Sequence, residues 1–239
     1  MKTSKGLSVL LSFVTAALVL SGAVAVPLLC RPFYYAHISA FRMPEQLGLP
    51  EEMIRQAYDQ VMDYCLGLSD RFSAGIFPFS ESGARHFADV RALFIFDLAA
   101  CGVCLVILLG SYLWCRHREV EPYRLKGHGP GFWAAVGLTA AFVVIGGLAA
   151  LDFEKAFVLF HRIFFPGQDN WLFSVYEDPV ILILPEAFFR NCAILILALV
   201  VVWSLALVAV DIWNGRRIRW AEEQAKLPPC HRTAFKQKK

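Results

Sequence analysis

The segment Ala187–Val210 reads AFFRNCAILILALVVVWSLALVAV and contains one charged residue, Arg190, in 24 positions. An α-helix rises about 1.5 Å per residue, so about 20 apolar residues are enough to cross the hydrocarbon core of a bilayer. A run of this length and composition predicts a transmembrane helix rather than the buried helix of a soluble domain. The segment therefore places the chain among integral membrane proteins.

Three other runs have the same character. Leu7–Leu29 has 23 residues and no charge, Ala92–Cys115 has 24 residues with Asp97 as its one charge, and Phe132–Leu151 has 20 residues and no charge. Over the whole chain 57% of residues are hydrophobic and 18% are charged, against about 25% charged in soluble domains. The sequence predicts an all-α integral membrane protein, a bundle of four transmembrane helices in a single membrane domain over residues 1–239.

The distribution of Lys and Arg predicts the orientation. With the N-terminus in the cytoplasm, 14 of the 23 basic residues lie before the first run, between the second and third runs, and in the tail 211–239. The remainder of the chain carries 9 basic and 15 acidic residues. The positive-inside rule then places both termini in the cytoplasm and the loops 30–91 and 152–186 outside. The basic and aromatic stretch Gly215–Trp220 suggests an anchor for lipid headgroups and gives little support to nucleic-acid binding.

Both outer loops contain amphipathic helices that predict a helical cap over the spans. Apolar residues recur with helical spacing from Met53 to Leu66, behind Pro50 and ahead of Gly67, which are suitable start and stop signals. In the second loop, phenylalanines recur at helical spacing, which predicts a short helix with a bilayer-facing stripe; they are Phe153, Phe157, Phe160 and Phe164.

A helix end rich in titratable side chains precedes the second span. Ser80 or Ser82 can cap this helix. His86 and Asp89 are three residues apart and share a face, and Arg85 lies four residues before Asp89 and can pair with it. A carboxylate beside an imidazole fixes its tautomer and raises its basicity, as a general base requires. On spacing alone, a solvated and charge-rich helix end is the simpler interpretation.

Further polar groups are expected near the outer edge of the membrane. His161 belongs to the second amphipathic helix, on the side predicted to face lipid, where a titratable group is costly and more often functional than not. Glu186 and Arg190 are four residues apart and can pair. Together with Asp97 they predict a polar pocket that opens outward between the second and fourth spans.

Two long motifs contain these histidines. In this sequence they read Phe79-Ser80-x-Ser82-Gly83-x-x-His86-x-x-Asp89-Val90-Arg91 and Phe160-His161-x-x-Phe164-Phe165-x-Gly167-x-Asp169-Asn170-Trp171-x-Phe173, the second followed by Asp178-Pro179-x-Ile181-x-x-Leu184-Pro185-Glu186-x-Phe188-Phe189. Both motifs resemble the signatures of a family of bacterial four-span membrane proteins that contains the lipoprotein intramolecular transacylases. The resemblance covers both loops and all four spans in order.

The resemblance implies an acyl migration within a lipoprotein whose N-terminal cysteine carries a diacylglyceryl group. One acyl chain moves from the glyceryl group to the α-amino group, and the N-acyl S-monoacylglyceryl form results. His86 and His161 are then the catalytic residues, and the partners are bacterial lipoproteins and membrane lipids. No cofactor or metal is expected, because donor and acceptor are already close on one molecule. The residues expected to support the pair are Asp89, Arg85, Arg91, Asp169, Asn170 and Glu186.

Two other classes of function remain open at this point. One is a metal-dependent membrane hydrolase with His86, Asp89 and His161 as ligands, which a chelator would inhibit. The other is a non-enzymatic four-span scaffold or assembly protein in which the motifs build an interface, and replacing either histidine would then spare function. Whether Cys30 and Cys65, the two cysteines of the outer loops, form a disulfide also stays open.

Overall fold

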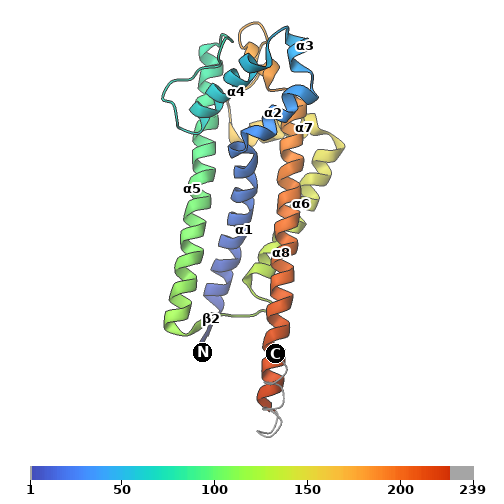
Figure 1. The fold of residues 1–239 in the computed structure, drawn as a ribbon. Coiled ribbons are helices and arrows are strands. Elements are labelled where there is room, and N and C mark those ends of the chain that lie inside the picture. Colours follow the sequence, from blue (N-terminus) through green and yellow to red (C-terminus); the bar gives the residue numbers. More distant parts are fainter. Residues whose placement is uncertain (1, 227–239) are drawn as a thin grey trace.

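The structure is a computed structural model that describes residues 2–226. Four long helices run side by side along an elongated molecule (Figure 1). Each contains one of the predicted apolar runs and is long and apolar enough to cross a membrane. They are α1 (Lys5–Leu29), α5 (Glu81–Arg118), α6 (Pro130–Leu151) and α8 (Glu186–Lys226). The predicted all-α fold with four transmembrane helices is confirmed, whereas the predicted tail beyond residue 226 lies outside the described residues.

Helix α1 is the centre of the bundle. It packs against α5, α6 and α8, and α6 also packs against α8. Gly22 allows a close approach, because a Cβ there would lie 3.1 Å from the ring of Trp203 on α8. Outward-facing side chains such as Phe96 and Val106 are apolar and exposed, as expected of helices whose surrounding solvent is lipid. The buried seam between the helices consists of Val19, Ala23, Leu138 and Val200.

A cap of short helices covers one end of the bundle (Figure 1). We use "the cap" for residues 31–80 and 153–185. Helix α4 buries six residues of the predicted apolar stripe, which are Ile54, Ala57, Tyr58, Val61, Met62 and Cys65. Gly67 follows the end of α4 with a φ of 76°, a left-handed conformation that glycine adopts without strain. Cys30 is exposed and Cys65 is buried, and both are free thiols. The short elements of the cap are α2 (Arg31–Ala40), α3 (Met43–Leu47), α4 (Glu51–Cys65), α7 (Phe153–Phe164) and the 3-10 helix η1 (Pro179–Ile183).

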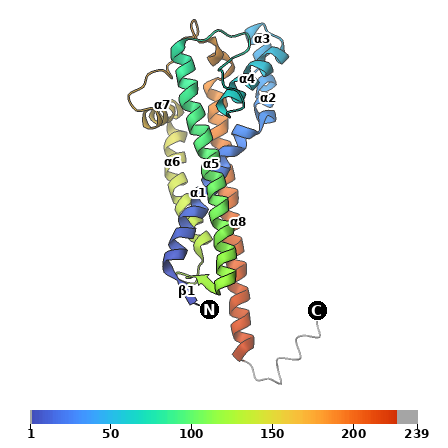
Figure 2. The same cartoon turned by 90° about the vertical axis from the view of Figure 1, so that its left-hand side faces the viewer.

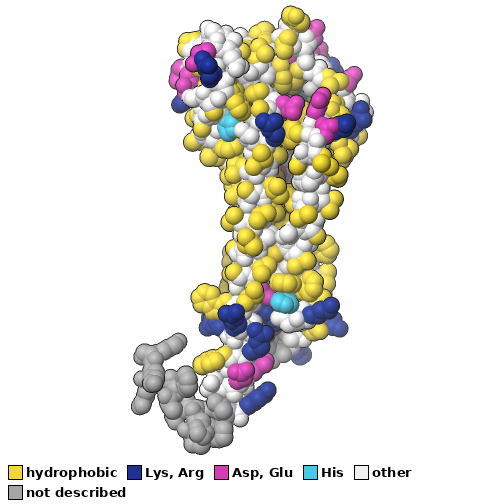
Figure 3. Space-filling model, turned by 90° about the vertical axis from the view of Figure 1, so that its right-hand side faces the viewer, with side chains coloured by type: hydrophobic (Ala, Val, Ile, Leu, Met, Phe, Trp, Pro, Cys, Tyr) yellow, Lys and Arg dark blue, Asp and Glu magenta, His cyan; other side chains and the backbone are white. Residues whose placement is uncertain are grey.

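The opposite end, which we call the base, comprises residues 2–4, 116–130 and 211–226. Strand β1 (Lys2–Ser4) pairs in parallel with β2 (Val120–Pro122), two short strands that the sequence did not suggest. Lysine and arginine side chains gather at this end, below the apolar shaft (Figure 3). Figure 2 shows α7 at the other end, beside the top of α6.

The predicted polar pocket between the second and fourth spans is wrong. The main neighbour of α5 is α1, whereas α8 packs against α6 and α1, so the spans that were to form the pocket are not paired. Glu186 and Arg190 are both exposed, and within residues 2–226 they form no ion pair. Such contacts depend on which helices are neighbours in the bundle. The spacing of residues along one helix does not predict that arrangement.

Candidate functional site

The structure brings His86 and His161 together beneath the cap, although they are 75 positions apart in the sequence. His86 lies on the first turns of α5, before the apolar run that begins at Ala92, and His161 lies on α7. Their ring centroids are 5.8 Å apart and the rings are inclined by 32°. The two residues are only 5% and 7% exposed. Helix α7 therefore turns His161 inward, and the prediction that it faces lipid is wrong. Of the four phenylalanines of the predicted stripe, Phe160 and Phe164 are exposed.

Aromatic rings form the walls around the two imidazoles. Phe165 and Phe173 meet His86 edge to face, with centroid distances of 5.0 and 5.4 Å. Trp171 stacks on His161 at 4.6 Å. These walls separate the imidazoles from bulk water and lower the local dielectric.

Hydrogen bonding defines the tautomer of His161. Its Nδ1 lies 2.8 Å from the backbone carbonyl oxygen of Phe157. A carbonyl oxygen only accepts, so Nδ1 carries the hydrogen in the neutral ring and Nε2 keeps a free lone pair. His161 therefore presents a proton-accepting nitrogen on the side of the ring away from its own helix backbone.

His86 is held through a side chain from the second motif. Asn170 donates from Nδ2 to Oδ2 of Asp89 at 3.0 Å. Within the described residues, Nδ1 of His86 and Oδ1 of Asn170 are both buried and have no other hydrogen-bond partner. These two unsatisfied atoms are complementary, because an Nδ1–H of His86 donating to Oδ1 of Asn170 would satisfy both. In that tautomer His86 also keeps a free lone pair on Nε2.

The surroundings keep both imidazoles neutral at ordinary pH. Burial and, second to it, the neighbouring His161 lower the pKa of His86 to about 4, although Asp89 and Asn170 act in the opposite direction. Burial also lowers the pKa of His161, and its bond to Phe157 opposes this shift. Because a charge on one ring disfavours a charge on the other, the pair can hold one added proton much more easily than two.

A buried carboxylate fixes the helix end that carries His86. Ser80 caps α5, and its hydroxyl accepts from the backbone N–H of Gly83 at 2.9 Å. Asp178, 4% exposed, accepts from the backbone N–H and the hydroxyl of Ser80 at 2.7 and 2.8 Å. A Cβ on Gly83 would lie 2.2 Å from Oδ1 of Asp178, so only glycine fits there. The cap by serine was foreseen, but sequence reasoning missed the anchor Asp178, whose only signal was its place in the second motif.

The remaining predicted supporting residues lie elsewhere or make other contacts. Arg85 is exposed, and in the described part of the chain it has no ion pair, so its predicted pairing with Asp89 is wrong. Arg91 instead donates to the carbonyl of Ser69 at 2.8 Å and so holds the turn after α4. Asp169 and Glu186 are exposed. Of the six residues, the structure joins Asp89 and Asn170 to the histidine pair.

His37, the third histidine at this end of the molecule, differs from His86 and His161. Nδ1 of His37 lies 2.7 Å from the carbonyl of Phe33, and Nε2 lies 2.9 Å from Nδ2 of Asn191, which donates to it. Both ring nitrogens are therefore occupied by the protein. No group of three or more His, Cys, Asp or Glu side chains placed to hold a metal ion occurs in residues 2–226, so the ligand set of the hydrolase alternative is not assembled.

Four apolar helices, capped at one end over a pair of buried imidazoles, define a multi-pass membrane protein. The sequence matches the family model described as "Lipoprotein intramolecular transacylase Lit" over residues 9–189, and the chain belongs to this family. No curated protein gives a significant match to the sequence.

Solved structures with the same fold come from that family. The chain is similar to the in meso structure of the membrane integral lipoprotein intramolecular transacylase Lit from Bacillus cereus, with a TM-score of 0.79 and 22% identity over 89% of this chain and 96% of that one. Structures of that protein with a histidine replaced by arginine or by alanine align with a TM-score of 0.73 and 21% identity. They cover 90% and 89% of this chain, and 92% and 94% of their own.

Proposed function

We propose that this protein moves an acyl chain within a diacylglyceryl-modified bacterial lipoprotein, from a glyceryl oxygen to the α-amino nitrogen of the N-terminal cysteine. The observation that carries the proposal is the pair of buried, neutral imidazoles at the capped end of the bundle. Membership of the transacylase family supports the substrate class. The product is the N-acyl S-monoacylglyceryl lipoprotein.

The reaction needs a base because the attacking amine starts out protonated. An α-amino group has a pKa of about 7.7–8.0, so most of it is an ammonium at neutral pH. The neutral amine attacks the ester carbonyl, and an N–C bond forms as one imidazole takes the amine proton. The tetrahedral intermediate then expels the glyceryl oxygen, the C–O bond breaks, and the alkoxide receives a proton. The ammonium first gives its extra proton to an imidazole, which passes it to solvent; from the neutral amine onward one proton leaves nitrogen and one arrives at oxygen, so no water is consumed.

We assign both proton transfers to His86 and His161. Nδ1 of His161 is bound to the carbonyl of Phe157, and we assign the Nδ1 hydrogen of His86 to the unsatisfied Oδ1 of Asn170, so each ring offers Nε2 to the substrate. One imidazole accepts the amine proton, and the other stabilises the oxyanion or protonates the leaving alkoxide. Asp89 acts through Asn170, which orients His86, and through its negative charge. The pair's preference for a single added proton suits a cycle that passes one proton from nitrogen to oxygen.

The environment of the pair also suits transfer rather than hydrolysis. The aromatic walls formed by Phe165, Phe173 and Trp171 limit the access of water to the tetrahedral intermediate. Phe160, Ile163 and Phe164 on α7 are exposed and apolar, and we propose that acyl chains reach the pair along this edge from the bilayer. Acceptor and donor belong to one molecule, so the reaction gains the advantage of proximity without an activated donor.

The proposal places the cap on the extracytoplasmic side, because lysines and arginines concentrate at the base. Single cysteines at Gln46 in the cap and Glu119 in the base, introduced after the native cysteines are replaced, test this orientation. In intact cells an impermeant thiol reagent should label the first and spare the second. The reverse pattern would contradict the orientation.

The activity is tested in a bacterial host that lacks N-acylated lipoproteins and carries one lipoprotein reporter. Fragmentation mass spectrometry of its N-terminal peptide should show one acyl group on nitrogen and one on glycerol when the protein is present, with unchanged total acyl content. Loss of one acyl chain without N-acylation would indicate a hydrolase. Conversion that persists when both His86 and His161 are replaced by alanine would contradict the assignment of the site.

A further inference from the structure

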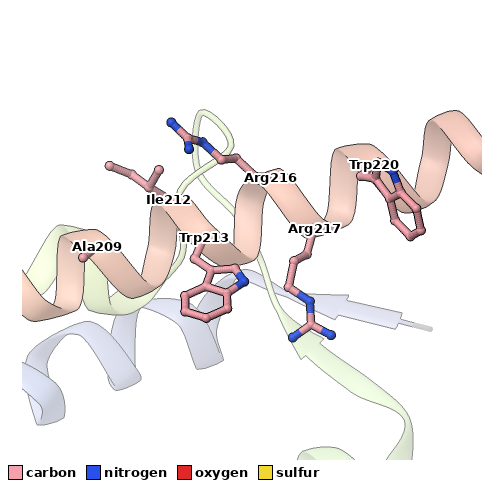
Figure 4. A pocket seen from close by; sticks show the side chains of 6 residues that line it. All are labelled: Ala209, Ile212, Trp213, Arg216, Arg217 and Trp220. Carbon is pink, nitrogen blue, oxygen red and sulfur yellow. The ribbon is translucent and has the colours of Figure 1, made fainter. Parts of the chain in front are cut away.

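The base carries a side-chain strip that the proposed chemistry does not use. Six residues of α8 line a shallow hollow on the side of the helix (Figure 4). Their spacing is helical, so they lie on one face. Trp213, Arg217 and Trp220 project from one edge of the strip, and Arg216 projects from the other (Figure 4). The strip comprises Ala209, Ile212, Trp213, Arg216, Arg217 and Trp220.

The charged groups of the strip have no partner in the described chain. Arg216 and Arg217 are exposed, and within residues 2–226 they form neither a hydrogen bond nor an ion pair. Arg124, at the same end of the molecule, is by contrast committed to Asp211 at 2.9 Å. Trp213 and Trp220 are 68% and 56% exposed. Two free guanidiniums therefore lie beside two large aromatic surfaces that are also uncovered.

The strip crosses the level at which a lipid headgroup lies. The apolar run of α8 ends at Val210, and Arg216 and Arg217 follow about 9–10 Å further along the helix axis. The polar layer of a bilayer leaflet is about 5–8 Å thick, so the backbone of both arginines lies just beyond it and their long side chains reach back to phosphate depth. Ala209 lies at the level of the acyl chains, and Ile212 and Trp213 lie at the interface, which tryptophan prefers.

We propose that this strip binds an anionic phospholipid, with Arg217, which projects from the same edge as Trp213 and Trp220, on its phosphate, and with Arg216 adding positive charge from the other edge. A guanidinium matches phosphate oxygens with paired hydrogen bonds, and a second positive charge nearby favours a headgroup that has no cation of its own. Phosphatidylglycerol fits this description, whereas the choline of phosphatidylcholine places a positive charge beside the arginines. One acyl chain lies along Ala209 and Ile212, and the indole of Trp213 packs on the glycerol region.

Brominated lipids test the site because they quench nearby tryptophans. The purified full-length protein in detergent is titrated with brominated phosphatidylglycerol or brominated phosphatidylcholine. We expect the phosphatidylglycerol to quench at the lower mole fraction. The excess quenching should disappear in the W213F/W220F variant, since the other four of the six tryptophans lie outside the strip. A preference of the same size in W213F/W220F would place the lipid elsewhere and overturn the proposal.

The arginines are tested by charge removal at two matched places. R216Q/R217Q should reduce the ratio of apparent affinities for phosphatidylglycerol and phosphatidylcholine about 30-fold, at about fivefold for each basic residue. R116Q/R118Q removes the same charge from exposed positions on α5 at the same end that do not line the hollow, and it should reduce the ratio by a clearly smaller factor. R216K/R217K retains the charge and should retain most of the preference, which separates loss of binding from misfolding.

Three results would overturn the proposal. An unchanged ratio in R216Q/R217Q would show that these arginines do not hold the lipid. An equal loss in R116Q/R118Q would show that the base attracts anionic lipid by its net charge alone, without a site. A dimer in detergent that R216Q/R217Q converts to a monomer, with no change in lipid preference, would assign the strip to a second copy of the chain.

Discussion

Two polar clusters that contain histidine lie at opposite ends of the described chain, and they differ in how their polar atoms are satisfied. At the base, Asp211 accepts from Arg124 at 2.9 Å, from Nδ1 of His128 at 2.7 Å and from the backbone N–H of Gly129 at 2.9 Å. Beneath the cap, His86 and His161 face each other, and neither forms an ion pair within residues 2–226. The first arrangement fits a cluster that stabilises the fold, and the second fits a reactive site.

The difference follows from the cost of burying polar groups. A buried carboxylate is stable only when its charge and lone pairs are matched, and Asp211 is 7% exposed and matched on both oxygens. Neutral imidazoles cost less to bury, but each leaves a lone pair unused. A buried imidazole with a free lone pair is expected where that lone pair binds or reacts with a substrate. The unused Nε2 atoms therefore point to chemistry, and the satisfied Asp211 points to stability.

The largest expected effect is the loss of either histidine of the pair. His86→Ala and His161→Ala should each lower the rate of acyl transfer by about 10²–10⁴-fold, the usual contribution of a general acid or base. His37→Ala is the matched control, because His37 lies in the same cap but both of its nitrogens are occupied. Quantitative mass spectrometry of the reporter peptide measures all three. Equal activity of His86→Ala and His37→Ala would remove the distinction between free and satisfied imidazoles.

The next effect tests the anchor of the helix that carries His86. Gly83→Ala places a methyl group 2.2 Å from Oδ1 of Asp178. The start of α5 must then shift, and we expect activity to fall about 10–100-fold with about 1–3 kcal/mol of lost stability. Asp178→Asn keeps the size but weakens the acceptor, and it should give a smaller loss. Ser82→Ala, at an exposed position of the same turn, should behave like the wild type in both thermal unfolding and turnover. A neutral Gly83→Ala would show that the anchor is not needed.

A smaller loss is expected at the second layer of contacts. Asn170→Ala should lower the rate about tenfold, because it removes the amide that links Asp89 to His86 but leaves both imidazoles in place. Asp89→Asn should have a similar or smaller effect, since Asn170 can still hold it. If Asp89 acts only through Asn170, the double variant will be no worse than Asn170→Ala. A strictly multiplicative double variant would mean that the two residues act separately.

The pair should also make the stability of the protein depend on pH. Burial lowers the pKa of His86 to about 4, below the 6.5 of the unfolded chain, so between these values the unfolded state binds the proton and the folded state does not. Stability due to this group is complete above pH 6.5 and is lost as the pH falls toward 4. Thermal unfolding in detergent should therefore shift downward from pH 7 to pH 5, and His86→Phe should shift less. An identical shift in both proteins would argue against a buried, neutral His86.

Much of the fold follows from patterns along the sequence. The four apolar runs predict the four spans, and the stripe from Met53 to Leu66 predicts α4 with its buried face, because both patterns are local and periodic. The meeting of His86 and His161 was expected only from a family resemblance. Spacing alone favoured a solvated helix end, since two residues 75 positions apart leave no periodic trace of their contact.

The errors share one physical cause, which is that long-range docking overrides local pairing. Arg85 and Asp89 have ideal spacing for an ion pair, but Asn170 reaches Asp89 from 81 positions away and takes its place. The Phe stripe of α7 shows helical period, yet the docking of α7 on α5 decides that His161 turns inward. The anchor of Ser80 on Asp178 spans 98 positions and has no local signal.

The smallest expected effect on acyl transfer comes from removing the side chain of Asp211 at the base of the molecule. Asp211→Ala strands the donors of Arg124, His128 and Gly129, and buried donors without partners cost about 1–3 kcal/mol each, less where water reaches them. Thermal unfolding should therefore occur at a clearly lower temperature. The base lies at the far end of the bundle from the histidine pair (Figure 1), so turnover measured below the unfolding transition should change less than twofold. A large loss of turnover in a folded Asp211→Ala protein would mean that the two clusters are coupled along the helices. The Asp211 cluster would then serve the reaction as well as the stability of the fold.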